Sequence, residues 1–184
     1  AVPNANPAYA YTEGKVLLEG RAQGADGRTT MSPYTLGPIR GPDGTFWLLW
    51  SWRDRPDSAD SNSRISIAKS TDLLTWRTVS GTTLPATIDY SLVDRSTAYR
   101  GLVVDEVAIS GGGLLNNQIG LGWDAADRPV VSYAKYVGTG SSQTTQMFVS
   151  RPSGLATAWI TTKVSSWTGR ADLALASTPN VLQM

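Results

Sequence analysis

Apolar and polar residues alternate along most of this chain, which is the pattern of β-strands, and helical periodicity is scarce. The turn signal Gly41-Pro42-Asp43-Gly44 leads into an apolar, aromatic run over residues 45–52, which predicts a strand buried on both faces. Residues 64–69 alternate cleanly and predict the next strand, and a turn at 71–74 separates it from a strand at 76–79. Further strands are expected over residues 117–123, 129–136, 146–151 and 159–164. The pattern therefore predicts an all-β protein.

The same plan of turn, apolar strand, polar loop, alternating strand and Trp-led strand occurs twice. The matched pairs are Asp43 with Asp127, Trp52 with Tyr136, Lys69 with Arg151, and Trp76 with Trp159. A repeated unit of this kind cannot bury its faces alone and must stack on its neighbours. Since propeller blades have roughly 40–50 residues, we expect about three to four blades of antiparallel four-stranded sheets. Residues 1–184 are thus expected to form one partial or shortened β-propeller domain.

Composition narrows the possible partners and sites. The formal net charge of +1 gives no electrostatic reason to expect binding to nucleic acid or to a membrane. The absence of Cys and His excludes disulfides, Cys-based metal sites and a His general base from this chain. Seven Trp and seven Tyr against two Phe suit surfaces that stack sugar rings, although filling a β core is the commoner role for each of them. No cofactor is predicted.

Several motifs, taken in order, resemble the BNR-4 repeat family. They are residues 43–53, Asn62, residues 65–76, residues 113–116, Ile119-Gly120 and residues 127–136, and they span about three quarters of the chain. The segment Ser70-Thr71-Asp72-Leu73-Leu74-Thr75-Trp76 resembles a degenerate Asp-box, in which Asp72 and Trp76 are expected to be scaffold. The resemblance implies a secreted or extracellular propeller similar to polysaccharide lyases of the ulvan or rhamnose–glucuronate type. It also implies that the chain is about half of a full member, with a second chain or copy as one way to complete the ring.

Two departures from the family pattern concern catalysis. The resemblance leads us to expect His directly after Asn62, where this chain has Ser63, and often within the Tyr-x-Lys-Tyr stretch, where it has Ala134. Both differences argue against a His-based mechanism in this chain.

β-Elimination on a uronate needs a cation that neutralises the carboxylate, a base and an acid. Tyr is able to serve as acid or base, and Arg pairs with carboxylates in a bidentate manner. Tyr136 and Arg151 are the catalytic candidates, because their strands are expected to pair across a hairpin loop at 138–142 and to face one groove. Arg53, Asn62 and Lys135 are the candidates for substrate binding. A turn-capping role for Asn62 and a salt bridge for Arg53 are the simpler alternatives.

Two rival sites depend on carboxylates. Asp94, Asp105 and Glu106 lie in an irregular segment and are the candidates for an acid pair of the glycoside hydrolase type. The loop after Arg53 contains the candidate oxygen ligands of a structural calcium ion, namely Asp54, Asp57 and Asp60. Their spacing matches no recognisable calcium loop, so a solvated loop is the favoured interpretation and no metal site is predicted.

Two functions follow as hypotheses. The first is a carbohydrate-active propeller, most similar to a lyase that cleaves uronate-containing glycans by β-elimination. The second is a non-catalytic glycan-binding propeller, or a fragment that needs a partner chain. In both hypotheses the partner is an acidic polysaccharide.

Overall fold

A computed structural model describes residues 17–20, 31–55, 58, 61–90, 97–109, 111–114, 118–166, 174–175 and 182–183. The protein is all-β: these residues form antiparallel sheets and one short parallel pair, and their only helical turns are the 3₁₀ turns η2 (Thr97–Tyr99) and η3 (Gly140–Ser142). The described part of the chain contains no helix that is long and apolar enough to cross a membrane.

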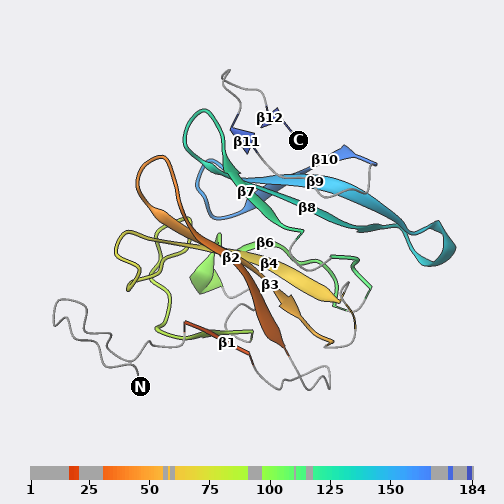
Figure 1. The fold of residues 1–184 in the computed structure, drawn as a ribbon, viewed down its shortest axis with the longest axis horizontal. Coiled ribbons are helices and arrows are strands. Elements are labelled where there is room, and N and C mark those ends of the chain that lie inside the picture. Colours follow the sequence, from red (N-terminus) through yellow and green to blue (C-terminus); the bar gives the residue numbers. More distant parts are fainter. Residues whose placement is uncertain are drawn as a thin grey trace, which may run out of the picture.

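Two four-stranded sheets dominate the fold (Figure 1). The first sheet has the order β2-β3-β4-β6, with β2 at Ser32–Arg40, β3 at Phe46–Arg53, β4 at Asn62–Ser70 and β6 at Val103–Asp105. The second has the order β7-β8-β9-β10, with β7 at Gly120–Trp123, β8 at Pro129–Val137, β9 at Thr144–Pro152 and β10 at Trp159–Ser165. Two short pairs complete the strands, namely β1 (Leu18–Glu19) with β5 (Ile88–Asp89) and β11 (Ala174–Leu175) with β12 (Leu182–Gln183). The third and fourth blades that the sequence leads us to expect stay a prediction.

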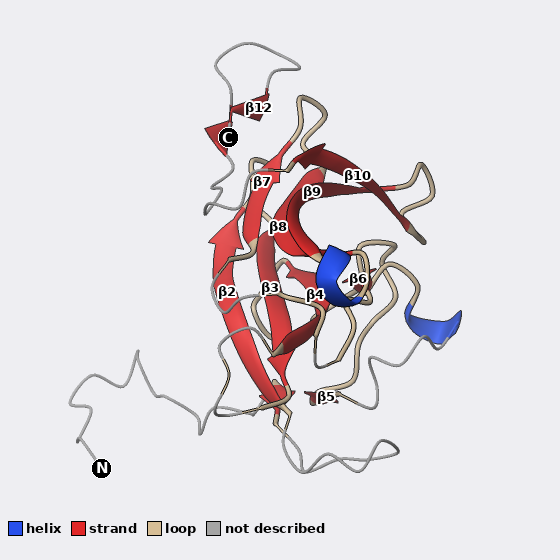
Figure 2. Ribbon diagram, turned by 90° about the vertical axis from the view of Figure 1, so that its right-hand side faces the viewer, coloured by secondary structure: helices blue, strands red, loops and turns tan. Residues whose placement is uncertain are grey.

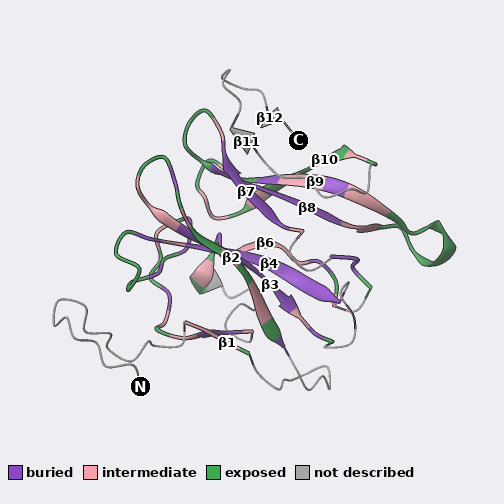
Figure 3. Ribbon diagram, viewed as in Figure 1, coloured by how far each residue is buried: buried purple, intermediate pink, exposed green. Residues whose placement is uncertain are grey.

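The two sheets pack face to face around a shared apolar core. The second sheet lies above the first in Figure 1, and Figure 2 shows the same strands turned by 90°. The core contains Trp47 and Leu49 from β3 and Val131 and Tyr133 from β8, so it joins the sheets directly. A second core lies on the opposite face of the first sheet, where Trp50 and other residues are covered by the segment between β4 and β6. Buried strands therefore lie at the centre of the molecule, and the hairpin tips are exposed (Figure 3).

The internal repeat is confirmed by strand register. Lys69 pairs with the residue directly after Trp76. Arg151, which is 82 residues after Lys69, pairs in the same way with the residue directly after Trp159. In the first sheet, however, this pairing is a single bridge rather than the expected strand over residues 76–79. The chain then leaves the sheet and returns as β6, which takes over the edge.

The predicted alignment of Asp43 with Asp127 is wrong by one residue. The turns before β3 and β8 make the same backbone hydrogen bonds, from Gly44 to the carbonyl of Gly41 at 3.0 Å and from Asp127 to that of Asp124 at 2.9 Å. Gly44 and Asp127 also share a left-handed backbone, with φ of 82° and 57°. The spacing is thus 83 residues (127 − 44), because the left-handed position and not the carboxylate defines the turn.

This one-residue correction changes which faces are equivalent, since successive strand residues point to opposite faces. At a spacing of 83 residues, Tyr133 corresponds to Trp50 (133 − 50), and Tyr136 corresponds to Arg53 (136 − 53) instead of to Trp52. Tyr133 faces the first sheet, whereas Trp50 faces away from the second sheet. Equivalent faces of the two sheets therefore point in the same direction, as in successive layers of a stack.

The Asp-box-like turn has the predicted scaffold role. Oδ1 of Asp72 accepts hydrogen bonds from the backbone N–H of Leu74 at 2.8 Å and of Thr75 at 2.7 Å, and from the Ser70 hydroxyl at 2.9 Å. The backbone hydrogen bond from Thr75, followed by that from Leu74, lowers the pKa of Asp72 to about 2. Leu73, with φ of 62°, makes the left-handed step of the turn.

We expect this carboxylate to make stability depend on acid pH. The folded pKa of about 2 lies below the ordinary aspartate pKa of 3.8, so the ionised side chain stabilises the fold above pH 4, and this stabilisation is lost as pH falls toward 2. Asp72→Ala should lower the urea midpoint at pH 7, and the difference from wild type should shrink as the pH approaches 2. Leu74→Ala changes an exposed side chain of the same turn and should keep the wild-type pH profile. A difference for Asp72→Ala that is constant from pH 7 to pH 2 would contradict this role.

The second sheet contains a turn with the same left-handed step but without the carboxylate. Ala156, with φ of 53°, stands 83 residues after Leu73 (156 − 73), and its backbone N–H donates to the carbonyl of Ser153 at 2.8 Å. The position of Asp72 is occupied by Leu155 (155 − 72), whose side chain is 81% exposed. The repeat therefore includes the left-handed backbone position of the turn, but it does not include the carboxylate that accepts the turn's hydrogen bonds.

Leu155→Asp should restore that acceptor. We expect the free energy of unfolding to rise by about 1 kcal/mol, the typical contribution of a side-chain acceptor that satisfies free backbone N–H groups. Urea denaturation at pH 7 measures the change. Leu155→Ala removes the exposed leucine without adding an acceptor, so equal stability of the Asp and Ala variants would contradict the expectation.

Candidate functional site

Arg53, at the end of β3, forms a polar cluster with Tyr34 of β2. Its Nη1 donates to the Tyr34 hydroxyl at 2.8 Å, and its Nε donates to the carbonyls of Arg55 at 2.8 Å and Ser58 at 3.1 Å. The guanidinium carbon lies 5.4 Å from the centroid of the Tyr34 ring. Arg53 thus keeps its own loop in place and presents a planar cation beside an aromatic ring.

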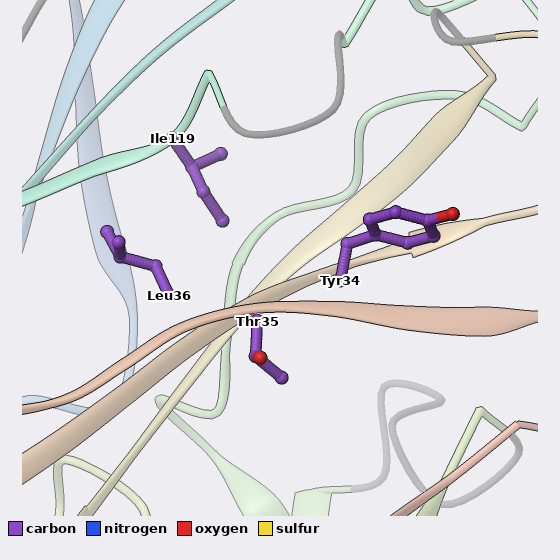
Figure 4. Close-up of a pocket in the computed structure, with 4 residues that line it drawn as sticks. All are labelled: Tyr34, Thr35, Leu36 and Ile119. Carbon is purple, nitrogen blue, oxygen red and sulfur yellow. The ribbon is translucent and has the colours of Figure 1, made fainter.

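A pocket of about 50 Å³ adjoins this cluster. It is lined by Tyr34, Thr35, Leu36 and Ile119. Tyr34 and Leu36 project from one side of β2, the side of Ile119, and Thr35 projects from the other (Figure 4). Because Ile119 directly precedes β7, the pocket lies where the two sheets meet. Its volume suits one substituent of a sugar ring, such as a carboxylate or hydroxyl group, rather than the whole ring.

Asn62 is a structural residue in this arrangement, not an exposed ligand contact. Its side chain is fully buried, its Nδ2 donates to the carbonyl of Leu114 at 3.0 Å, and its Oδ1 accepts from the Ser51 hydroxyl at 3.4 Å. Its backbone N–H also donates to the carbonyl of Leu114, at 3.3 Å. The predicted contact with a sugar hydroxyl is not available here, because the amide fastens the glycine-rich loop, residues 111–114, to the start of β4.

Lys135 belongs to a polar cluster between the two sheets. Its Nζ and the Tyr133 hydroxyl both donate to Oδ2 of Asp105 at 2.5 Å, and the Tyr133 oxygen lies 3.0 Å from the Ser150 hydroxyl. The ammonium also lies 4.9 Å from the centroid of the Phe148 ring. Burial, and then the negative charge of Asp105, raise the pKa of Tyr133 far above its usual range, so the phenol stays protonated and donates. Lys135 therefore joins the two sheets through its ion pair with Asp105. This ion pair engages the ammonium group that was predicted to bind the substrate.

Tyr136 and Arg151 are not brought together. Their strands pair as predicted and both side chains lie on the face of the second sheet that points away from the first. However, Tyr136 pairs with Thr145, which is six residues before Arg151, and at about 3.3 Å per strand residue the two positions are about 20 Å apart. No single sugar ring is within reach of both.

The glycine-rich loop covers Tyr136. The backbone N–H of Tyr136 donates to the carbonyl of Gly112 at 2.7 Å. Gly113, at φ of 69°, lies so close to the ring that an added Cβ would be 2.4 Å from its Cγ. The loop thereby connects the end of β8 to Asn62 of the first sheet.

The rival carboxylate sites do not assemble an acid pair in the described residues. Glu106 forms an ion pair with Arg64 at 2.9 Å, and Asp105 is in the inter-sheet cluster. Arg64 lies at a bulge of β4 with φ of 43°, and its guanidinium stacks 4.4 Å from the centroid of the Tyr90 ring. Asp94 lies outside the described residues.

The predicted calcium loop is only partly described. Asp54 is buried, and Asp57 and Asp60 lie outside the described residues. Elsewhere in the described ranges, no group of three or more His, Cys, Asp or Glu side chains gathers in a metal-binding arrangement.

Tyr34 is the site residue that the sequence interpretation missed. The signal was present, because Tyr34 and Leu36 are apolar positions two residues apart with the polar Thr35 between them. Pro33 interrupts that pattern and makes the segment resemble a loop, whereas an edge strand tolerates proline.

Comparison with known proteins supports the family but not a particular activity. A search of curated proteins found no match to the chain. A family model described as BNR repeat-containing family member matches residues 4–167, which is most of the chain. Together with the two repeated four-stranded sheets and the Asp-box-like turn, this match shows that the chain belongs to the BNR repeat-containing family.

Proposed function

We propose that the chain binds an acidic, uronate-containing polysaccharide at the cluster of Tyr34 and Arg53. The observation that carries this proposal is the contact of the Arg53 guanidinium with the Tyr34 hydroxyl beside a pocket at the sheet junction. A guanidinium pairs with a carboxylate through two parallel N–H donors, and a tyrosine offers a sugar an apolar ring face and a polar hydroxyl. Membership of a carbohydrate-related repeat family agrees with this ligand class.

Lyase activity is the second candidate. β-Elimination needs a group that exchanges protons with the substrate and a cation on the uronate carboxylate. The Arg53 guanidinium contacts the Tyr34 hydroxyl itself, whereas Arg64 stacks on the Tyr90 ring and is paired with Glu106. This assignment replaces the pair Tyr136 and Arg151, which are too far apart to act on one ring.

The proposal includes an extracellular location and further blades that complete a propeller. The blades would come from the rest of a longer protein or from a second copy. Support comes from the two sheets, whose equivalent faces point the same way and therefore leave the stack open to continue. Mass measurement in solution, with and without glycan, tests the partner: a monomer with protected amides would argue against an obligatory second copy.

Binding and cleavage are separated by one experiment. The protein is incubated with ulvan or with a rhamnose–glucuronate glycan, while binding is measured by calorimetry and the unsaturated uronate product by ultraviolet absorbance. Binding without new absorbance supports a glycan-binding domain, and binding with absorbance supports the lyase. The absence of both signals would contradict the proposed function.

A further inference from the structure

The indole nitrogens of two tryptophans from different sheets both lie close to Gly41. Trp47 belongs to β3 and Trp123 ends β7, and their exposed fractions are 4% and 9%. A Cβ atom added to Gly41 would lie 2.9 Å from Nε1 of Trp47 and 3.1 Å from Nε1 of Trp123. Both nitrogens therefore lie close to the position of that added Cβ atom, and they are at most 6.0 Å apart, which is the sum of the two distances.

Both donors lack a partner among the described residues. A buried N–H that makes no hydrogen bond costs about 1–3 kcal/mol, and such groups are usually satisfied in native proteins. An indole nitrogen only donates, so what both groups need is an acceptor. Since N–H···O distances are about 2.9 Å, one compact acceptor between the two nitrogens is able to serve both.

Position 41 requires a glycine because a side chain would collide with the two indole nitrogens, and not because of its backbone conformation. Its φ lies outside the left-handed region, in contrast to that of Gly44 at 82°. Gly41 is buried, its N–H donates to the carbonyl of Thr45 at 2.7 Å, and its carbonyl accepts from Gly44. Any larger residue would place its Cβ against both indole nitrogens and displace whatever they bind.

We propose that Trp47, Trp123 and Gly41 form a buried site for one compact acceptor, either a water molecule or a halide ion. The chemistry shared by these ligands is a small size and lone pairs that accept two N–H groups at once. The ammonium of Lys69 lies 5.9 Å from the centroid of the Trp47 ring and makes the site compatible with an anion. The bound acceptor would connect the turn before β3 to the end of β7, and so would fasten the first sheet to the second.

Crystals of the full chain grown with bromide in place of chloride test the proposal directly. An anomalous peak within hydrogen-bond distance of both indole nitrogens assigns a halide site. A peak of oxygen size without anomalous signal assigns a water site. Density that shows neither, with both indole N–H groups unpartnered or bonded separately to protein atoms, would overturn the proposal.

A solution measurement tests whether the two indoles share a ligand. In Trp123→Phe the ring bulk is largely kept and one donor is removed, so the indole proton resonance of Trp47 should shift and its exchange with solvent should change. Gly41→Ala should remove the crystallographic peak, whereas Gly154→Ala, which has open space around the added methyl group, should keep it. An unchanged Trp47 resonance in folded Trp123→Phe would overturn the proposal, even if Gly41→Ala fails to fold.

Discussion

Arg53→Ala should lower the affinity for a rhamnose–glucuronate glycan by about 10- to 100-fold. The variant loses a charge-assisted pair with the uronate carboxylate, which contributes about 1.5–3 kcal/mol, and 1.4 kcal/mol corresponds to a tenfold change in affinity. Arg53→Lys keeps the charge but not the planar pair of donors, so its affinity should lie between those of the wild type and the alanine variant. Calorimetric titration at constant ionic strength measures all three.

Arg151→Ala is the matched control for this prediction. It also removes one positive charge, but from an exposed position on the second sheet that does not line the Tyr34 pocket. Tyr34→Phe tests the hydroxyl of the site separately, because Arg53 keeps its contacts with the carbonyls of Arg55 and Ser58 while only the hydroxyl is lost. Equal losses for Arg53→Ala and Arg151→Ala would show that the binding is non-specific attraction to positive charge and would contradict the site.

Asp105→Ala should be strongly destabilising, with a loss of about 2–4 kcal/mol in the free energy of unfolding. Oδ2 of Asp105 accepts from both the Tyr133 hydroxyl and the Lys135 ammonium, and the side chains of Asp105 and Lys135 are only 14% and 24% exposed. Removing the carboxylate leaves a buried phenol and a mostly buried cation without their acceptor. Urea denaturation at pH 7 measures the loss.

A double variant tests the cause of that loss. Adding Lys135→Met to Asp105→Ala removes the uncompensated charge, so the double variant should be more stable than Asp105→Ala alone. Arg128→Ala is the surface control, because it breaks an ion pair with Asp124 in which Arg128 is 51% exposed, and we expect a cost below about 1 kcal/mol. An effect of Asp105→Ala no larger than that of Arg128→Ala would contradict an inter-sheet role for this cluster.

The repeat and the central strands were predictable because their signals are local. The apolar run that forms β3 and the alternation that forms β4 depend only on period-two patterning. The scaffold role of Asp72 followed from the resemblance of its turn, residues 70–76, to an Asp-box. Local patterns did not give the exact spacing, since the matching of Asp43 to Asp127 relied on residue identity, whereas the turn depends on the left-handed φ shared by Gly44 and Asp127.

The candidate site was less predictable because its contacts join segments that are distant in sequence. Asp105 lies in a stretch without clear periodicity, and only the return of the chain as β6 places it against Tyr133 and Lys135. Tyr136 and Arg151 were correctly assigned to paired strands, but pairing does not bring two residues together unless their register also matches.

The site is tested most directly by mapping the resonances that change when a rhamnose–glucuronate oligosaccharide is added to the isotope-labelled chain. We predict that the changes concentrate on Tyr34, Thr35, Leu36, Arg53 and Ile119. Tyr136 and Arg151 should remain unchanged. Saturable changes centred on Tyr136 or Arg151, with the Tyr34 pocket unaffected, would contradict the account.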